Sequence, residues 1–336
     1  MFTARSVHDA ITERSPAYAI LGIDSEDRFK DYDVAAASRP AQYNGSPYNF
    51  QITKNESIMN GFFTRLAVTE VNFPWTIGNL LPNNNEITVE YSVAGVVQPA
   101  FSVVLPTGFL RPSQIAAFLQ LAIRTEDPVN LGAFTMLYGV SPQDISGYPT
   151  LVNAAYPYFT YKTNAAGVEI GFFQLPANSA PWPYPATVKQ MFDLLGFDSQ
   201  NNELAEEGSG LSTYCQSIRY IDIVCNQLTY NQALKDTMSQ PIARDTLCRL
   251  YLGDGPYTGT STMSPDDPDF CPPGCAPFTI YRQYTNPKFI RWLPNQPVQG
   301  NLQFQVFDDN GVLLSSIDEL EGAGTNWSMT LLVSED

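Results

Sequence analysis

Histidine, cysteine and charged residues are all scarce in this chain of 336 residues. It contains one histidine, five cysteines and only 15% Asp, Glu, Lys and Arg. A serine or cysteine nucleophile activated by histidine would depend on His8, which lies in a segment without strand or helix periodicity. Five cysteines, an odd number in a long chain, are too few for the framework of a secreted disulfide-rich domain. Neither histidine-activated catalysis nor a disulfide scaffold is therefore expected.

Basic residues are few as well, since 18 Lys and Arg stand against 34 Asp and Glu and leave a net charge of −16. Such a balance repels a phosphate backbone, so nucleic acid is not expected as a direct partner. The longest apolar stretch, residues 93–105, is interrupted by Gln98 and Pro99 and is too short to cross a bilayer. Charges near the N-terminus argue against a secretory signal. We expect no transmembrane segment and no secretion.

Patterns typical of β-strands dominate the rest of the chain. Residues 62–73 are rich in aromatic and β-branched residues and are expected to end at Pro74, while residues 86–93 alternate with period 2 and return over 96–105 as a hairpin. Further strands are expected at residues 156–163, 168–175, 218–230, 244–252, 278–284, 289–293, 301–307, 312–317 and 327–333. Because strands and helices do not alternate, the pattern predicts an all-β protein, an antiparallel β-sandwich or barrel, and the sandwich is the architecture that we expect.

Two predicted helices interrupt the strands. Residues 109–124 place apolar side chains at helical spacing, with Pro112 at a favourable position for a helix start. A second, short helix is expected over residues 187–195, capped by Thr187 and stopped at Gly196. The strands 156–163 and 168–175 lie between these helices on either side of a turn. We therefore expect a helix-hairpin-helix (α+β) insertion.

No sequence motif for catalysis, phosphate binding or metal binding occurs in a suitable context, so no catalytic residue, cofactor or metal ion is assigned and the protein is not expected to be an enzyme. The abundant carboxylates leave a glycosidase-like pair open as an alternative, because two such groups on a β scaffold would suffice. Asp266, Asp267 and Asp269 share a proline-rich loop that lacks the glycine and the distal glutamate of a calcium-binding loop. These aspartates could ligate a hard cation, but a solvated acidic loop is the favoured interpretation.

Cys271 and Cys275 flank the segment Pro-Pro-Gly, whereas the other three cysteines lie in apolar runs, as buried thiols usually do. Cys271 and Cys275 are interpreted as free thiols in a turn, as a local disulfide, or as two metal ligands. The third interpretation is the weakest, since two ligands do not complete a tetrahedral zinc site and His8 is distant in sequence.

Trp182 and Tyr184 alternate with three prolines over residues 181–185. The prolines fix an extended backbone and would hold both rings rigidly. The segment either packs against its own domain or forms a loop that contacts a partner, and exposed rings of this kind could also stack on a sugar.

Several segments together resemble the minor capsid (penton) proteins of virophages, polinton-like viruses and related giant viruses. The segments, in family order, are YNFQI at 48–52, NGFFTRLAVTEV at 60–71, FPW at 73–75, IGN at 77–79, MFDLLGF at 191–197, YIDIV at 220–224, DDNG at 308–311 and WSMTLLVSE at 327–335. They are dispersed from residue 48 to residue 335, and their order carries the resemblance more than any single segment does.

The resemblance implies a single jelly roll and a homopentamer at an icosahedral vertex of a virion. The implied partners are the major capsid protein and other shell proteins, with synthesis and assembly inside the host cell. The expected domains are an N-terminal arm at 1–45, a jelly roll at 46–105 and 201–336, and an insertion module at 106–200. A short double-jelly-roll major capsid protein and a lectin-like receptor- or glycan-binding sandwich are the alternatives.

Overall fold

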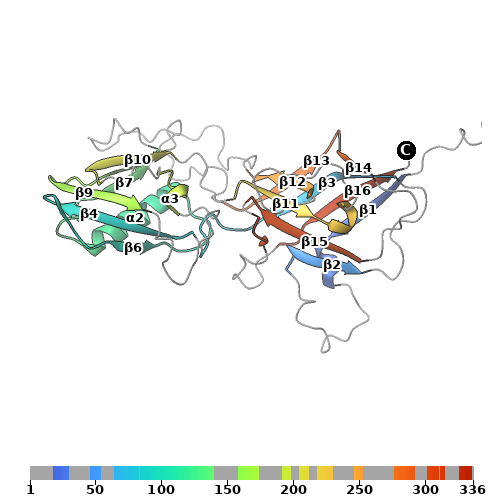
Figure 1. Cartoon of the computed structure of the whole chain (residues 1–336), viewed down its shortest axis with the longest axis horizontal. Helices are drawn as coiled ribbons and strands as arrows, with labels where there is room; N and C mark the ends of the chain where they lie inside the picture. The colour runs from blue at the N-terminus through green and yellow to red at the C-terminus, as the bar shows by residue number, and fades with distance from the viewer. Residues whose placement is uncertain are drawn as a thin grey trace, which may run out of the picture. The chain divides into compact units, whose positions relative to one another are not determined.

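The computed structural model describes residues 18–29, 46–53, 64–82, 84–139, 158–173, 191–197, 204–211, 218–229, 246–252, 276–291, 301–309, 311–314 and 325–334. The chain forms two compact units, both built mainly of β-strands (Figure 1). Unit 1 comprises residues 1–75, 221–250 and 279–336, and unit 2 comprises residues 76–220 and 251–278.

Unit 1 is a sandwich of two sheets. The first sheet has the order β1 (Tyr18–Asp24), β16 (Ser328–Ser334), β3 (Arg65–Trp75) and β13 (Phe278–Gln283), with β14 (Phe289–Arg291) also paired to β3. The second sheet has the order β12 (Thr246–Tyr251), β11 (Tyr220–Val224), β15 (Asn301–Asp308) and β2 (Asn49–Thr53). If β13 and β14 are counted as one interrupted strand, the strands of unit 1 can be numbered 1 to 8 by their order along the chain. Side by side, they then lie in the order 1-8-3-6 in the first sheet and 5-4-7-2 in the second. This is the strand order of a jelly roll, so the predicted all-β fold is confirmed.

Aromatic side chains from both sheets meet in the core of unit 1. The ring of Trp327, just before β16, lies 5.6 Å from Phe50, 5.8 Å from Phe73 and 6.3 Å from Phe304, measured between ring centroids. The indole N–H donates a hydrogen bond of 2.7 Å to the carbonyl of Pro47, so its polar atom is satisfied although it is buried. These contacts join residues of β2, β3 and β15 around one side chain.

Strand β3 continues through Pro74 to Trp75, so the prediction that Pro74 ends this strand is wrong. The last residue of β3 in register with β16 is Asn72. Pro74 lies beyond it, and a proline there removes no hydrogen bond to β16.

Unit 2 contains the remaining strands and the longest helix. Its first sheet joins β4 (Glu86–Val93) to β5 (Val96–Val97), β6 (Phe101–Val104) and β9 (Val168–Phe173). Its second sheet has the order β10 (Glu207–Leu211), β8 (Tyr158–Lys162) and β7 (Thr135–Tyr138). The helices are α2 (Pro112–Glu126) and α3 (Met191–Leu194). The described strands of unit 2 do not repeat the order found in unit 1.

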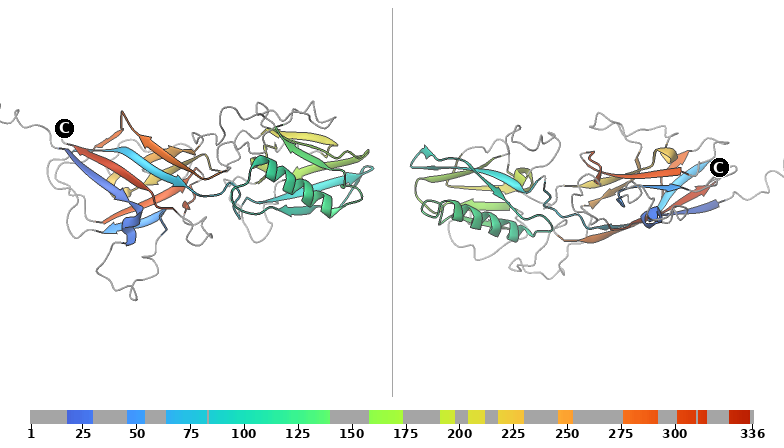
Figure 2. Two further views of the ribbon diagram at one scale, coloured as in Figure 1. Left: turned by 180° about the vertical axis from the view of Figure 1, so that it is seen from behind. Right: turned by 90° about the horizontal axis from the view of Figure 1, so that it is seen from below.

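Helix α2 begins at Pro112 as predicted and packs against β6 and β7 (Figure 2). It buries Ile115, Leu119 and Ile123, which share one face at helical spacing. The side chain of Gln114 accepts a hydrogen bond of 2.9 Å from the backbone N–H of Arg111, which satisfies a donor at the helix start.

The predicted hairpin between residues 156 and 175 is wrong in its pairing. Both segments are strands, β8 and β9, but β8 pairs with β7 and β10 while β9 pairs with β4. The turn at residues 164–167 therefore passes from one sheet to the other. A turn signal in the sequence reports a change of direction and carries no information about the partner strand.

Two further segments differ from their predictions. Strand β11 ends at Val224, where residues up to Tyr230 were expected to be extended, and a single helical turn, α4 (Asn226–Thr229), follows. The hydroxyl of Thr229 donates to the carbonyl of Cys225 at 3.0 Å and closes this turn. Of the predicted strand 312–317, the described residues form one bridge, between Leu313 and Phe307.

The compact units divide the chain at other points than the expected domains do. The first jelly-roll strand, β1, lies within residues 1–45, which the sequence analysis assigns to an arm. Residues 76–105, with β4, β5 and β6, belong to unit 2. Unit 2 is thus inserted mainly between β3 and β11, the third and fourth strands of the jelly roll.

Candidate interaction surfaces

The titratable side chains at the core of unit 1 have structural partners. The two carboxylate oxygens of Asp222 accept hydrogen bonds of 2.7 and 2.9 Å from Arg249, so an ion pair connects β11 and β12. Burial raises the pKa of the Cys225 thiol to about 12 and that of Cys248 to about 11, which keeps both in the unreactive protonated form. Within the described ranges, no group of three or more His, Cys, Asp or Glu could hold a metal ion.

The site residues singled out by the sequence all lie outside the described residues. These are Cys271, Cys275, Trp182 and Tyr184, together with His8 and the acidic loop at 266–269. The local disulfide and the partner-contact loop therefore stay predictions.

Exposed apolar side chains in unit 1 gather on its first sheet. Within the described part of this unit, the large apolar residues of high exposure are Tyr18 (68%), Ile20 (75%), Tyr281 (58%) and Phe289 (43%). The first two belong to β1, and the others belong to β13 and β14. Among the described residues of the second sheet, Tyr251 at the end of β12 is comparably exposed, and it is assigned to unit 2.

The register of the strands places an apolar row across the outer face of this sheet. Val333, Leu66 and Ile290 lie opposite one another, are buried, and mark the inner face. The neighbouring row in the register lies on the outer face. It consists of Ile20 on β1, Leu332 on β16, Ala67 on β3 and Phe289 on β14. Strand side chains alternate between faces, so these four residues share one face. Ile20 and Phe289, at the two ends of this row, are exposed, whereas Leu332 is half-buried and Ala67 is buried. The exposed apolar side chains of this face therefore lie at its two margins, where a partner could cover them.

The sequence pattern of β1 contained a signal for this surface. Residues 18–21, Tyr-Ala-Ile-Leu, are apolar at both odd and even positions. A strand with one solvated face alternates apolar and polar residues, and this segment does not.

Unit 2 exposes apolar residues on α2 and near β5 and β6. Phe118 and Leu121 lie on the side of α2 that faces away from its buried residues, and Val129 follows the helix. The buried face of this helix includes Ile115, Leu119 and Ile123 but not Phe118. An amphipathic helix with apolar residues on its outer side is typical of a helix that also contacts a partner.

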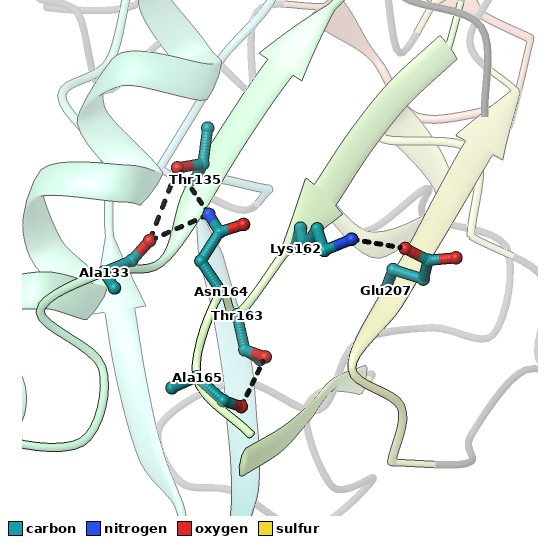
Figure 3. Close-up of polar contacts among 7 residues, drawn as sticks. All are labelled: Ala133, Thr135, Lys162, Thr163, Asn164, Ala165 and Glu207. Atoms are coloured by element: carbon teal, nitrogen blue, oxygen red, sulfur yellow. Dashed lines mark hydrogen bonds and ion pairs between the residues drawn. The ribbon is translucent and has the colours of Figure 1, made fainter. Parts of the chain in front are cut away.

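Polar contacts near the end of β8 link it to the start of β7 on one side and to β10 on the other (Figure 3). The side-chain amide of Asn164 donates to the carbonyl of Ala133 and to the hydroxyl of Thr135, each at 3.0 Å. Asn164 has a φ of +54°, a conformation that asparagine tolerates better than most residues. Lys162 on β8 and Glu207 on β10 form an exposed ion pair of 3.1 Å. These contacts stabilise the passage between the two sheets of unit 2.

A small cavity of about 270 Å³ lies beside β8 and β10. Its lining comprises Tyr161, Phe172, Phe197, Ala205, Glu207, Gly208 and Ser209. Phe172 and Phe197 stack with centroids 4.9 Å apart, and burial raises the pKa of Tyr161 to about 12. The one carboxylate in this lining, Glu207, is paired with Lys162. A two-carboxylate site of the glycosidase kind is therefore not found in this cavity.

No helix within the described residues is long and apolar enough to span a membrane. No family model matches the sequence, and no curated protein does. Among solved structures, the chain is similar to a crystal structure of a selenomethionine-labelled mavirus penton protein. The superposition covers 96% of this chain and 100% of that chain, with a TM-score of 0.51 and 11% sequence identity. The likeness is one of fold, and it extends over both compact units.

Proposed function

We propose that this chain is a structural protein of a virus particle: a minor capsid (penton) subunit that forms pentamers at icosahedral vertices. The observation that carries the proposal is the likeness in fold to a penton protein over essentially the full length of both chains. Because that likeness includes the unit inserted between β3 and β11, it concerns more than a jelly roll, which many unrelated proteins share.

The exposed apolar surfaces support a role in assembly. A closed ring uses heterologous contacts, in which two different surfaces of each subunit are complementary. Such a subunit has apolar residues on more than one surface, as unit 1 does on β1 and, three strands away in the same sheet, on β13 and β14. The low charged fraction of 15% agrees with this role, since interface cores are depleted in charge.

The partners in this proposal are copies of the same chain, the major capsid protein and other shell proteins, within a virion assembled inside the host cell. The net charge of −16 favours a shell protein whose contact with the genome is made by others. The role is structural and non-enzymatic, and the ion pair of Asp222 and Arg249 serves the fold.

Native mass spectrometry of the purified full chain tests the proposal. We expect a mass of five subunits, and negative-stain images with fivefold symmetry. A chain that remains monomeric at high concentration, both alone and with the shell proteins of its virus, would contradict it. A glycan array tests the lectin-like alternative, which predicts binding that is independent of assembly.

A further inference from the structure

Two opposite margins of the first sheet of unit 1 have complementary properties. The β1 margin consists of Tyr18, Ile20, Asp24 and Glu26, and the β13–β14 margin consists of Arg65, Tyr281, Lys288 and Phe289. Strands β16 and β3 separate β1 from β14, so the margins lie about 14 Å apart across the sheet. Each margin includes two of the four exposed large apolar residues of this sheet.

The charges of the two margins are opposite. At the β1 margin, the Asp24 carboxylate accepts a hydrogen bond of 2.8 Å from the backbone N–H of Glu26, whose own side chain is exposed. At the β13–β14 margin, the Arg65 guanidinium lies 5.9 Å from the ring centroid of Phe289, and the neighbouring Lys288 is exposed. Two basic side chains at one margin, Arg65 and Lys288, stand out in a chain with a net charge of −16.

A hydrogen bond joins Glu70 and Tyr281 at the β13–β14 margin. The Glu70 carboxylate accepts a hydrogen bond from the Tyr281 hydroxyl and raises the pKa of that tyrosine. The Glu70 carboxylate is thus held by a hydrogen bond within its own subunit, and Lys288 is an exposed positive charge at this margin.

Strand β1 is also an edge without the usual protection. Among the described strands it has a neighbour on one side only, β16. Exposed edges of soluble monomers are normally protected by lysine, proline or a bulge, because their free N–H and C=O groups pair with other chains. The sequence of β1, YAILGID, contains neither lysine nor proline, and Gly22 has open space where a side chain would be. These features are those of an edge that a partner covers.

We propose that the β1 margin of one subunit contacts the β13–β14 margin of a second copy of this chain, in a heterologous contact that repeats around the ring. This inference rests on the proposed function and names the surfaces that would join the subunits. Tyr18 and Ile20 pack against Tyr281 and Phe289 of the neighbouring copy, while Glu26 and Asp24 face Lys288 and Arg65. Opposite charges on different margins favour head-to-tail contact over a symmetric dimer, in which like margins would meet.

Charge reversal tests the pairing of the two margins. Glu26→Lys and Lys288→Glu are each expected to raise the dissociation constant of the oligomer about tenfold, because each places like charges opposite each other. The double variant carries both reversals in one chain, so opposite charges face each other again at every contact. We expect it to recover most of the wild-type assembly, as measured by sedimentation velocity and native mass spectrometry. Glu207→Lys, a reversal at an exposed carboxylate on β10 of unit 2, is the matched control and should leave assembly unchanged.

A second pair of variants tests the apolar part of the contact. Ile20→Thr keeps strand propensity but removes apolar surface, and it should weaken assembly by at least tenfold without a change in the circular dichroism spectrum. Leu211→Thr, at a residue 53% exposed on β10 of unit 2, is its control.

The possible outcomes separate this proposal from the proposed function. If the wild type forms pentamers and neither the reversals nor Ile20→Thr affects them, the margins are not the contact, although the capsid role stands. If the single reversals weaken assembly and the double variant does not recover it, the two margins do not face each other and the proposal is likewise overturned. A wild type that never associates overturns both.

Discussion

At the scale of the residue, the difference between buried and exposed ion pairs allows a direct test of the fold. Asp222 is 2% exposed, and its carboxylate depends on the Arg249 guanidinium for two hydrogen bonds. Arg249→Met leaves this carboxylate without its bidentate partner, so we expect the free energy of unfolding to fall by about 3 kcal/mol. Denaturant unfolding followed by circular dichroism measures the change.

The exposed pair of Lys162 and Glu207 provides the control for that measurement. Its side chains are 28% and 56% exposed, and such pairs contribute at most about 1 kcal/mol. Lys162→Met should therefore be nearly neutral. Equal losses in the two variants would show that Asp222 is not shielded from water as the structure describes.

At the scale of the element, the turn between β4 and β5 has a conformation that its sequence does not favour. Val93 and Val96 are paired, and the two residues between them, Ala94 and Gly95, have φ values of +52° and +77°. This is the two-residue turn in which Asn-Gly is preferred. Ala94→Asn is expected to raise the free energy of unfolding by about 0.5 kcal/mol, and Gly95→Ala to lower it by about 1 kcal/mol. The same sign for both changes, measured by thermal unfolding, would contradict the described turn.

The elements also show which parts of the fold the sequence could predict. Local signals were sufficient for α2, which begins at Pro112, and for β4, which alternates with period 2. They were insufficient where pairing is decided by distant residues. The turn at 164–167 allowed a hairpin, yet β9 pairs with β4, about 80 residues earlier in the chain. Strand β1 was missed for the same reason, because its partner is the last strand of the chain.

The apolar row on the outer face of the first sheet could not be recognised in the sequence, because pairing between distant strands brings its residues together. Ile20, Leu332, Ala67 and Phe289 are scattered over the chain, and only the register of four strands places them on one face. No local window contains two of these residues. The aromatic segment around Trp182, which the sequence does make conspicuous, lies outside the described residues.

At the scale of the whole molecule, the jelly roll is completed by the pairing of its first and last strands. The register of β1 and β16 runs from Tyr18 opposite Ser334 to Asp24 opposite Ser328. On the inner face, Ile23 of β1 is 3% exposed and lies opposite Met329. The sandwich therefore depends on β1, whereas an arm would be dispensable.

Two N-terminal deletions distinguish these possibilities. Removal of residues 1–17 retains β1 and should leave the melting temperature of unit 1 within a few degrees of the wild type. Removal of residues 1–24 exposes the edge of β16 and the side chains that Leu21 and Ile23 cover, so we expect a loss of several kcal/mol and aggregation. Scanning calorimetry and size-exclusion chromatography measure the two effects. If the longer deletion is as stable as the shorter one but no longer assembles, β1 contributes to the contact between subunits and not to the sandwich itself, because only the margin that it supplies would have been lost.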